Sequence, residues 1–259
     1  MRRFFTSKPA KRRGQDGWRA YVVGDVHGRL DLLDDLLARI EADHANRSVK
    51  RGLIVFLGDL IDRGPASAGV VERIRTLKLP GFSTVAITGN HEEVLRRILD
   101  GEAGEIAGWL RYGGAETLQS YGLDPDQLRV LGQAEQQERI LAAIPEAHRH
   151  FYATMADSLR FGDYLLVHAG IRPGVDLDQQ KLHDLRWIRE PFLSDTRDHG
   201  VAVVHGHTIS EAVEVVGSRI GIDTGAYSTG RLTAFAIEGK GRWLIDTIDG
   251  MRERESSRV

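Results

Sequence analysis

The sequence predicts an α/β fold with a mainly parallel sheet, and three features of the chain support this expectation. Apolar runs of strand length recur, they lack alternating polar residues, and helical patterns separate the early ones. Apolar runs that are rich in β-branched residues and do not alternate are typical of strands buried on both faces. Strands that alternate with helices indicate βαβ units, and therefore a mainly parallel sheet.

The expected strands are short and share this apolar character. They are "YVV" (21–23), "LIVFL" (53–57), "VAIT" (85–88), "YLLV" (164–167), "VAVV" (201–204) and "IGI" (220–222). Leucine and isoleucine recur at helical spacing from Asp31 to Ile40, which predicts a helix after the first strand. A similar pattern from Val70 to Leu77 predicts a helix after the second strand.

Between about residues 92 and 156 the pattern becomes helical. Val94–Leu99 and Ile140–Ile144 have helical spacing. Asp124 is the expected N-cap of a further helix, with Pro125 at its first position. We expect these helices to form an insertion over one end of the sheet and not a separate domain.

Two hairpins are predicted in the second half of the chain. The first spans residues 158–167 and turns at Gly162–Asp163, and the second spans residues 231–248 and turns near Gly239–Gly241. With the strands and helices above, they complete a single expected domain at residues 18–250.

The termini and the composition exclude several other classes of protein. Residues 1–17 are expected to form a basic, flexible tail and residues 251–259 a frayed end. No signal peptide, anchor or membrane span is expected, since no sufficiently apolar segment occurs, so we expect a cytoplasmic protein. The formal net charge is -2, which argues against specific nucleic-acid binding. The chain contains no cysteine, so any metal must be held by oxygen and imidazole.

Side chains that bind metals follow five of the expected strands, at the point where each strand ends. Because ligands of open α/β folds bind outside the carboxyl ends of the strands, we expect these side chains to share one crevice. They are Asp25 and His27 after the first strand, Asp59 after the second, Asn90, His91 and Glu92 after the third, His168 after the fourth, and His205 and His207 after the fifth.

The types of these side chains indicate a site for two metal ions. Each motif taken alone also fits a helix cap, a turn or an ordinary buried histidine, and it is their shared position at strand ends that favours a metal site. Carboxylate, amide and imidazole groups without sulfur suit Mn²⁺, Fe²⁺ or Zn²⁺ better than Ca²⁺. The candidate ligands are too many for one catalytic ion with an open position, so we expect two divalent ions that share Asp59. Mn²⁺ is the preferred ion, with Fe or Zn as alternatives. The candidates are Asp25, His27, Asp59, Asn90, His168 and His207.

Five motifs together, "GDVHG", "GDLIDRG", "GNHE", "HAG" and "GHT", resemble the phosphoprotein phosphatase family of dinuclear metallophosphatases. The resemblance implies a central β-sandwich of two mixed sheets flanked by helices, which is a four-layer fold. It also implies that Asp25, His27 and the bridging Asp59 hold the first metal, and that Asn90, His168 and His207 hold the second. The stretches "WIREPFL" (187–193) and "WLRYGGAETLQSYG" (109–122) are similar to the bacterial branch, whereas the C-terminal motif of the eukaryotic enzymes is absent.

The residues around these ligands support phosphate ester hydrolysis. Two metal ions roughly 3.5–4 Å apart can bind and acidify a bridging water, which then attacks the phosphorus in line. Arg63 can fork onto two phosphate oxygens, and Asn90 is expected to bind the phosphate as well as a metal. The resemblance adds Arg189 as a second phosphate ligand, although an ordinary surface arginine is the alternative. His91 can protonate the leaving alkoxide, and Asp62 would orient and charge His91.

Several other residues have weaker expectations. The roles of Glu92, His205 and Asp223 stay open, and Glu92 could either support the site or place charge at a helix N-terminus. Trp109 and Leu110 are expected to fill the helical insertion. The remaining histidines are expected to be ordinary surface residues. They are His44, His148, His150, His183 and His199.

The leading hypothesis is a metal-dependent phosphatase that hydrolyses phosphoserine and phosphothreonine in proteins. The alternative is a symmetrical dinucleoside tetraphosphate hydrolase, or a phosphoesterase of broad specificity, acting on small phosphorylated molecules. The symmetrical hydrolases that this chain resembles usually lack the histidine of "GDVHG" and the aspartate of "DRG". This chain keeps both, as His27 and Asp62, so the resemblance favours phosphomonoesters. A catalytically silent binding module is a third hypothesis, and the complete set of expected ligands argues against it. The sequence does not fix the physiological substrate or the oligomeric state.

Overall fold

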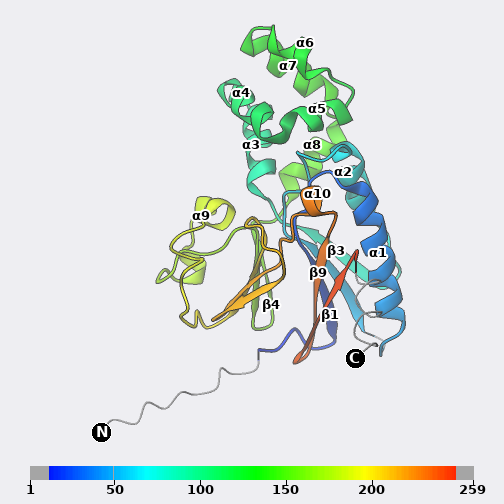
Figure 1. Cartoon of the computed structure of the whole chain (residues 1–259), viewed down its shortest axis with the longest axis vertical. Helices are drawn as coiled ribbons and strands as arrows, with labels where there is room; N and C mark the ends of the chain where they lie inside the picture. The colour runs from blue at the N-terminus through cyan, green and yellow to red at the C-terminus, as the bar shows by residue number, and fades with distance from the viewer. Residues whose placement is uncertain (1–11, 49, 249–259) are drawn as a thin grey trace.

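Two β-sheets form the centre of the protein (Figure 1). The computed structural model describes residues 12–48 and 50–248 of the 259 residues, so most of the expected N-terminal tail and all of the expected C-terminal tail lie outside the described residues. Within the described residues each sheet has five strands, in the orders β10-β9-β1-β2-β3 and β4-β5-β6-β8-β7. The first sheet consists of β1 (Trp18–Val23), β2 (Arg51–Phe56), β3 (Phe82–Ala86), β9 (Thr233–Glu238) and β10 (Gly241–Asp246). The second consists of β4 (Ser158–Phe161), β5 (Tyr164–Val167), β6 (Ala202–His205), β7 (Glu214–Val216) and β8 (Arg219–Gly221).

The alternation of side chains along each strand explains why the apolar runs are continuous. In β1, Ala20 and Val22 pack into the core between the two sheets, whereas Tyr21 and Val23 pack against the helical side. Successive side chains of a strand point to opposite faces, so a strand covered on both faces needs apolar residues at every position. Full burial of each large apolar side chain contributes roughly 1.5–3 kcal/mol.

Helices cover the outer face of each sheet. The first sheet is covered by α1 (Leu30–Ala45) and α2 (Ser67–Arg75), whose buried residues join the same core as the outer face of β1 and β2. On the second sheet, Leu165 and Val203 pack against Leu185 of α9 (Leu182–Trp187) and against Phe192. The protein therefore has four layers, and the β-sandwich implied by the resemblance is confirmed.

The expectation of one mainly parallel sheet is wrong. The pairs β1–β2, β2–β3, β5–β6 and β6–β8 are parallel, but the other four pairs within the described residues are antiparallel. Buried apolar strands look alike in a parallel sheet and in the core of a sandwich, so periodicity alone could not separate the two arrangements.

A run of helices between β3 and β4 extends beyond one end of the sheets (Figure 1). The predicted helices are confirmed, including the N-cap at Asp124, whose carboxylate accepts a hydrogen bond from the amide of Asp126. The predicted hairpins are also confirmed, as β4–β5 and β9–β10. The run consists of α3 (Asn90–Leu99), η1 (Ala103–Glu105), α4 (Ile106–Trp109), the kinked segment η2 (Leu110–Gly114), α5 (Ala115–Ser120), α6 (Pro125–Arg129), α7 (Gln133–Ala143) and α8 (Glu146–Thr154). Two further short helices are η3 (Leu177–Gln179) and α10 (Ala226–Thr229).

His148 of α8 is not the surface residue that the sequence predicted. It is buried, and its two ring nitrogens lie 2.8 Å from the Tyr121 hydroxyl and 2.9 Å from a Glu72 carboxylate oxygen. The reason is that α8 packs against α2, a tertiary contact that no local pattern reveals. No helix in the described part of the chain is both long and apolar enough to cross a membrane.

Candidate active site

The six predicted metal ligands are buried together at the carboxyl ends of the strands. Asp25, His27, Asp59, Asn90, His168 and His207 are each at most 8% exposed. Two groups of side chains could each hold an ion, and the ligand atoms within each group lie within 4.8 Å of one another. One group is His27, Asp59 and His91, and the other is Asp59, His168 and His207. Asp59 belongs to both groups, whereas Asp25 belongs to neither and His91, predicted as the acid, belongs to the first.

Backbone carbonyls orient two of the imidazoles toward this centre. The Nδ1 atoms of His27 and His168 lie 2.7 Å from the Ile61 carbonyl and 2.9 Å from the Leu57 carbonyl, respectively. With each Nδ1 held by a carbonyl, each Nε2 faces Asp59, whose oxygens lie 3.7 Å and 3.4 Å away. Nε2 of His168 also lies 2.9 Å from Oδ1 of Asn90. Such outer hydrogen bonds are the usual way in which proteins fix the tautomer of a metal-binding histidine.

The loops that carry the site have unusual backbone conformations. Left-handed φ angles occur at five non-glycine residues among those described, and each costs of order 1–3 kcal/mol unless the surroundings enforce it. They are His27 (φ 45°), Asp59 (φ 48°), Asp62 (φ 72°), Arg63 (φ 68°) and His207 (φ 64°). The strain is concentrated in the residues that the sequence singled out, which is typical of functional sites.

The residues present fit divalent cations. The Nε2 atom of His207 is buried without a hydrogen-bond partner, which is costly for a polar atom unless something else binds it. Burial raises the pKa of Asp25 well above its usual range, and the nearby charges of Asp223 and Asp59 raise it further. Burial also lowers the pKa of His27 and of His207 to about 3, so both rings are neutral, which is the form that binds metals. A cation among these groups would satisfy the free nitrogen and neutralise the buried carboxylates.

His91 and Asp62 form a buried pair beside the ligands. Nδ1 of His91 lies 2.6 Å from Oδ2 of Asp62, and Nε2 of His91 lies 3.9 Å from Oδ2 of Asp59. Burial alone would lower the pKa of His91, but the Asp59 charge and the Asp62 hydrogen bond raise it to about 9. The Asp59 charge and the Asp62 hydrogen bond thus favour the protonated form of His91, which is the form that a general acid needs.

Glu92 supports the loop that carries Asp59, a role that the sequence left open. Its buried carboxylate accepts hydrogen bonds from the amides of Asp59 (2.9 Å), Leu60 (2.8 Å) and Gly89 (2.9 Å). The bond to Gly89 completes a capping box at the N-terminus of α3. The other two residues with open roles are buried: Asp223 accepts a hydrogen bond from the Gly225 amide, and Nδ1 of His205 lies 2.9 Å from the Gly206 carbonyl.

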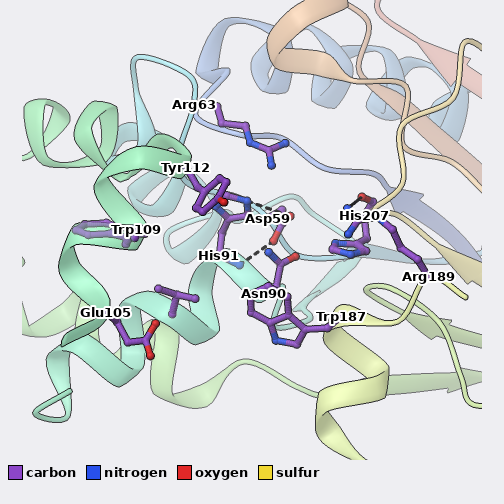
Figure 2. A pocket seen from close by; sticks show the side chains of 12 residues that line it. Asp59, Arg63, Asn90, His91, Glu105, Trp109, Tyr112, Trp187, Arg189 and His207 are labelled. Atoms are coloured by element: carbon purple, nitrogen blue, oxygen red, sulfur yellow. Dashed lines mark hydrogen bonds and ion pairs between the residues drawn. The ribbon is translucent and has the colours of Figure 1, made fainter. Parts of the chain in front are cut away.

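A cleft of about 370 Å³ opens beside Asp59 and His91. Figure 2 shows Arg63 and Arg189 on different sides of it, with Arg189 beside His207. Arg63 donates to Nε2 of His27 at 3.2 Å, and its guanidinium lies 4.9 Å from the centre of the Tyr227 ring. Arg189 donates to the carbonyl of His207 at 3.4 Å. The three predicted phosphate ligands, Arg63, Arg189 and Asn90, thus line the cleft.

The sequence missed the aromatic walls of this cleft. Tyr112 from η2 and Trp187 at the end of α9 line it, and Tyr112 is 68% exposed. Trp109 is buried in the helical run as expected, but it also lines the cleft and donates its indole N–H to Asp62 at 2.9 Å. The available signal was the position of these aromatic residues within the two stretches that resemble the bacterial branch.

The four-layer fold and the paired ligand groups define a metal-dependent phosphoesterase. The chain belongs to the calcineurin-like phosphoesterase family, whose model matches residues 19–233. The predicted family, fold and hydrolase class are therefore confirmed, together with the use of divalent metals by this family.

The relatives carry two kinds of name. The chain is 28% identical over 228 residues to serine/threonine-protein phosphatase 2 of Escherichia coli (strain K12), a match that covers 84% of this chain and 92% of that protein. It is 34% identical over 153 residues to the symmetrical bis(5'-nucleosyl)-tetraphosphatase of Acidovorax sp. (strain JS42), which covers 59% of this chain and 44% of that protein. A crystal structure described provisionally as a diadenosine tetraphosphatase has the same fold, with a TM-score of 0.64 and 20% identity over 92% of this chain and 97% of that chain.

Proposed function

We propose that this protein hydrolyses phosphate monoesters and that phosphoserine and phosphothreonine in proteins are its preferred substrates. The observation that carries the proposal is the position of Asp59. It is shared by two buried groups of ligands, and it lies at the edge of a cleft that also holds His91, Arg63 and Arg189.

Two divalent ions would be held by residues of this chain. Asp25, His27 and Asp59 would bind the first, and Asp59, Asn90, His168 and His207 the second. Mn²⁺ is the preferred ion, with Fe or Zn as alternatives, because the ligands combine oxygen and imidazole without sulfur. When bound, such ions supply Lewis acidity, which lowers the pKa of a coordinated water and neutralises charge on the phosphate.

The arginines and Asn90 would position the phosphate. Arg63 and Arg189 approach the cleft from different sides, so their guanidinium groups can contact different phosphate oxygens (Figure 2). Phosphoryl transfer depends mainly on positioning and on stabilisation of charge, which two fixed guanidinium groups supply.

His91 would donate its proton to the oxygen of the leaving group. Its Nδ1 is held by Asp62, so Nε2 is the atom that faces the cleft and gives up the proton. The departing group then leaves as a neutral alcohol. The Asp62 carboxylate stabilises the protonated form of His91 and so favours its reprotonation from solvent.

The alternative substrate is a dinucleoside tetraphosphate, which the name of the Acidovorax relative and the aromatic walls of the cleft support. The buried His91–Asp62 pair favours the monoester. A serine alkoxide is strongly basic and needs a proton, whereas a nucleoside phosphate leaves as a stable anion.

A substrate panel tests the proposal directly. The Mn²⁺-loaded protein should hydrolyse phosphoserine and phosphothreonine peptides with a higher kcat/KM than diadenosine tetraphosphate, and Asp59→Asn should abolish both activities. Preference for the dinucleotide by the intact protein would overturn the proposed substrate class. Activity that Asp59→Asn retains would overturn the proposed site.

A further inference from the structure

The segment from Trp109 to Ser120, here called the cap segment, contacts the active site at several points. It contains the end of α4, the kinked η2 and α5, and it lies within the stretch "WLRYGGAETLQSYG". We infer that Trp109 and Thr117 of this segment are positioning residues that fix the Asp62 carboxylate, and through it the orientation of His91. This inference rests on the proposed role of His91 as the acid.

The Asp62 carboxylate is held at both oxygens. The indole N–H of Trp109 donates to Oδ2 at 2.9 Å, the same oxygen that lies 2.6 Å from Nδ1 of His91. The hydroxyl of Thr117 donates to Oδ1 at 2.6 Å. All three partners are buried, so no exposed water competes for the carboxylate. With both oxygens bound, the carboxylate cannot rotate about its terminal torsion without breaking a hydrogen bond.

Thr117 also fixes the backbone of Asp62. Its hydroxyl oxygen accepts the Asp62 amide at 2.9 Å, and the hydroxyl of Ser67 lies 3.0 Å from the same amide. Asp62 has a left-handed φ of 72°, an unfavourable conformation for a residue with a side chain. The cap segment therefore holds the strained backbone and the side chain of Asp62 together.

The two glycines of the segment explain how it comes so close. The carbonyl of Gly113 accepts the Arg63 amide at 3.1 Å, and a Cβ on Gly113 would lie 2.6 Å from that nitrogen. A Cβ on Gly114 would lie 2.3 Å from the Trp109 ring. Gly113 also has a φ of 114°, at a kink between α4 and α5 where the backbone leaves helical geometry, and a glycine adopts such a φ without strain. Gly113 thus leaves room for Arg63, the residue next to Asp62, and Gly114 leaves room for the Trp109 ring.

Fixing Asp62 matters because it determines where the acid points. His91 carries its proton toward the cleft only while Nδ1 stays on Asp62. Loss of the indole donor leaves Oδ2 bound by His91 alone, and loss of the threonine hydroxyl frees Oδ1. Either change should weaken proton donation without removing a metal ligand or a phosphate ligand.

The test compares two esters that differ in their need for a proton. Trp109→Phe keeps the ring and removes the N–H, and Thr117→Val keeps the shape and removes the hydroxyl. Each should lower kcat/KM on a phosphoserine peptide by about 10- to 100-fold, the scale of one hydrogen bond to a charged group, with less than about threefold loss on nitrophenyl phosphate. Thr117→Ser should restore most of the activity, and metal content should not change.

A matched control and a double variant exclude a purely structural effect. Trp243→Phe removes the same kind of bond, an indole N–H that donates to Asp43 at 3.2 Å in another part of the protein, and should leave both activities unchanged. In an Asp62→Asn background, Trp109→Phe should cause no further loss on the phosphoserine peptide.

The inference and the proposed function fail in different ways. Equal losses on both esters from Trp109→Phe and Thr117→Val would overturn the inference, and so would additive losses with Asp62→Asn. In either case a selective loss from His91→Ala would still support the role of His91 as the acid. Equal losses from His91→Ala itself would overturn the acid. Should Trp109→Phe fail to fold, the Thr117→Val and Thr117→Ser pair decides the question by the same two esters.

Discussion

The two sides of the active site are built in different ways. On the metal side, the candidate ligands lie on short loops that directly follow strands of both sheets, as His168 follows β5 and His207 follows β6. On the acid side, Asp62 is held by Trp109 and Thr117, which come from the helical run between β3 and β4. The sheets therefore gather the ligands, and the helices shape the surroundings of the acid.

This difference separates two properties of a phosphatase. Residues on the metal side should affect every phosphate ester, because all esters share the phosphoryl group. Residues on the acid side should affect an ester in proportion to how badly its leaving group needs a proton. The following variants test this division, beginning with the largest expected effect.

His91→Ala should show the acid side most clearly. Loss of a general acid lowers kcat/KM by about 10²- to 10⁴-fold for a basic leaving group, so the phosphoserine peptide should suffer far more than nitrophenyl phosphate. Metal content should survive, since Asn90 and not His91 is the proposed ligand. Steady-state kinetics on both esters, with elemental analysis of the protein, checks this. His150→Ala, an exposed histidine of α8, is the control. Loss of metal from His91→Ala would mean that His91 is a ligand.

Arg63→Ala should show the effect of losing a contact to the phosphoryl group, which all esters share. Removing one fixed donor to transition-state charge costs about 10²- to 10³-fold, and here the loss should be similar on both esters. The measurement is kcat/KM on two chemically unrelated esters. Arg73→Ala removes an arginine paired with Asp34 on the surface and should change neither. If one ester is spared by Arg63→Ala, this residue does not bind the phosphoryl group in general.

Tyr112→Ala should have the smallest effect, because Tyr112 only lines the wall of the cleft. An aromatic contact worth roughly 0.5–1.5 kcal/mol corresponds to about a 2- to 10-fold rise in KM for peptides, with kcat almost unchanged. Val130→Ala, an exposed residue of the same helical run outside the cleft, is the control. A fall in kcat at constant KM would place Tyr112 on the acid side.

The metal side could be predicted from the sequence because its signals are local. Each candidate ligand stands next to a glycine or an apolar run, so Asp59 and His168 could be recognised where strands end. The structure also places Arg63 and Arg189 at the cleft, although their roles stay proposals.

Other features depend on contacts between distant segments and could not be predicted. Glu92 binds the amides of Asp59 and Leu60 across more than 30 positions, and Trp109 reaches Asp62 across 47. His148 is buried only because α8 packs on α2. Likewise, the division of the strands into two sheets depends on which strand faces pack together, and an apolar run does not indicate its packing partner.

The most direct test of the account is the number and position of the bound ions. Elemental analysis of the Mn²⁺-loaded protein should give two ions per chain, and a crystal soaked in Mn²⁺ should show Asp59 bound to both. Asp59→Asn should lose metal and activity on every ester, because both ions depend on this carboxylate. A single ion held without Asp59, or two ions that persist in full without it, would contradict the central claim.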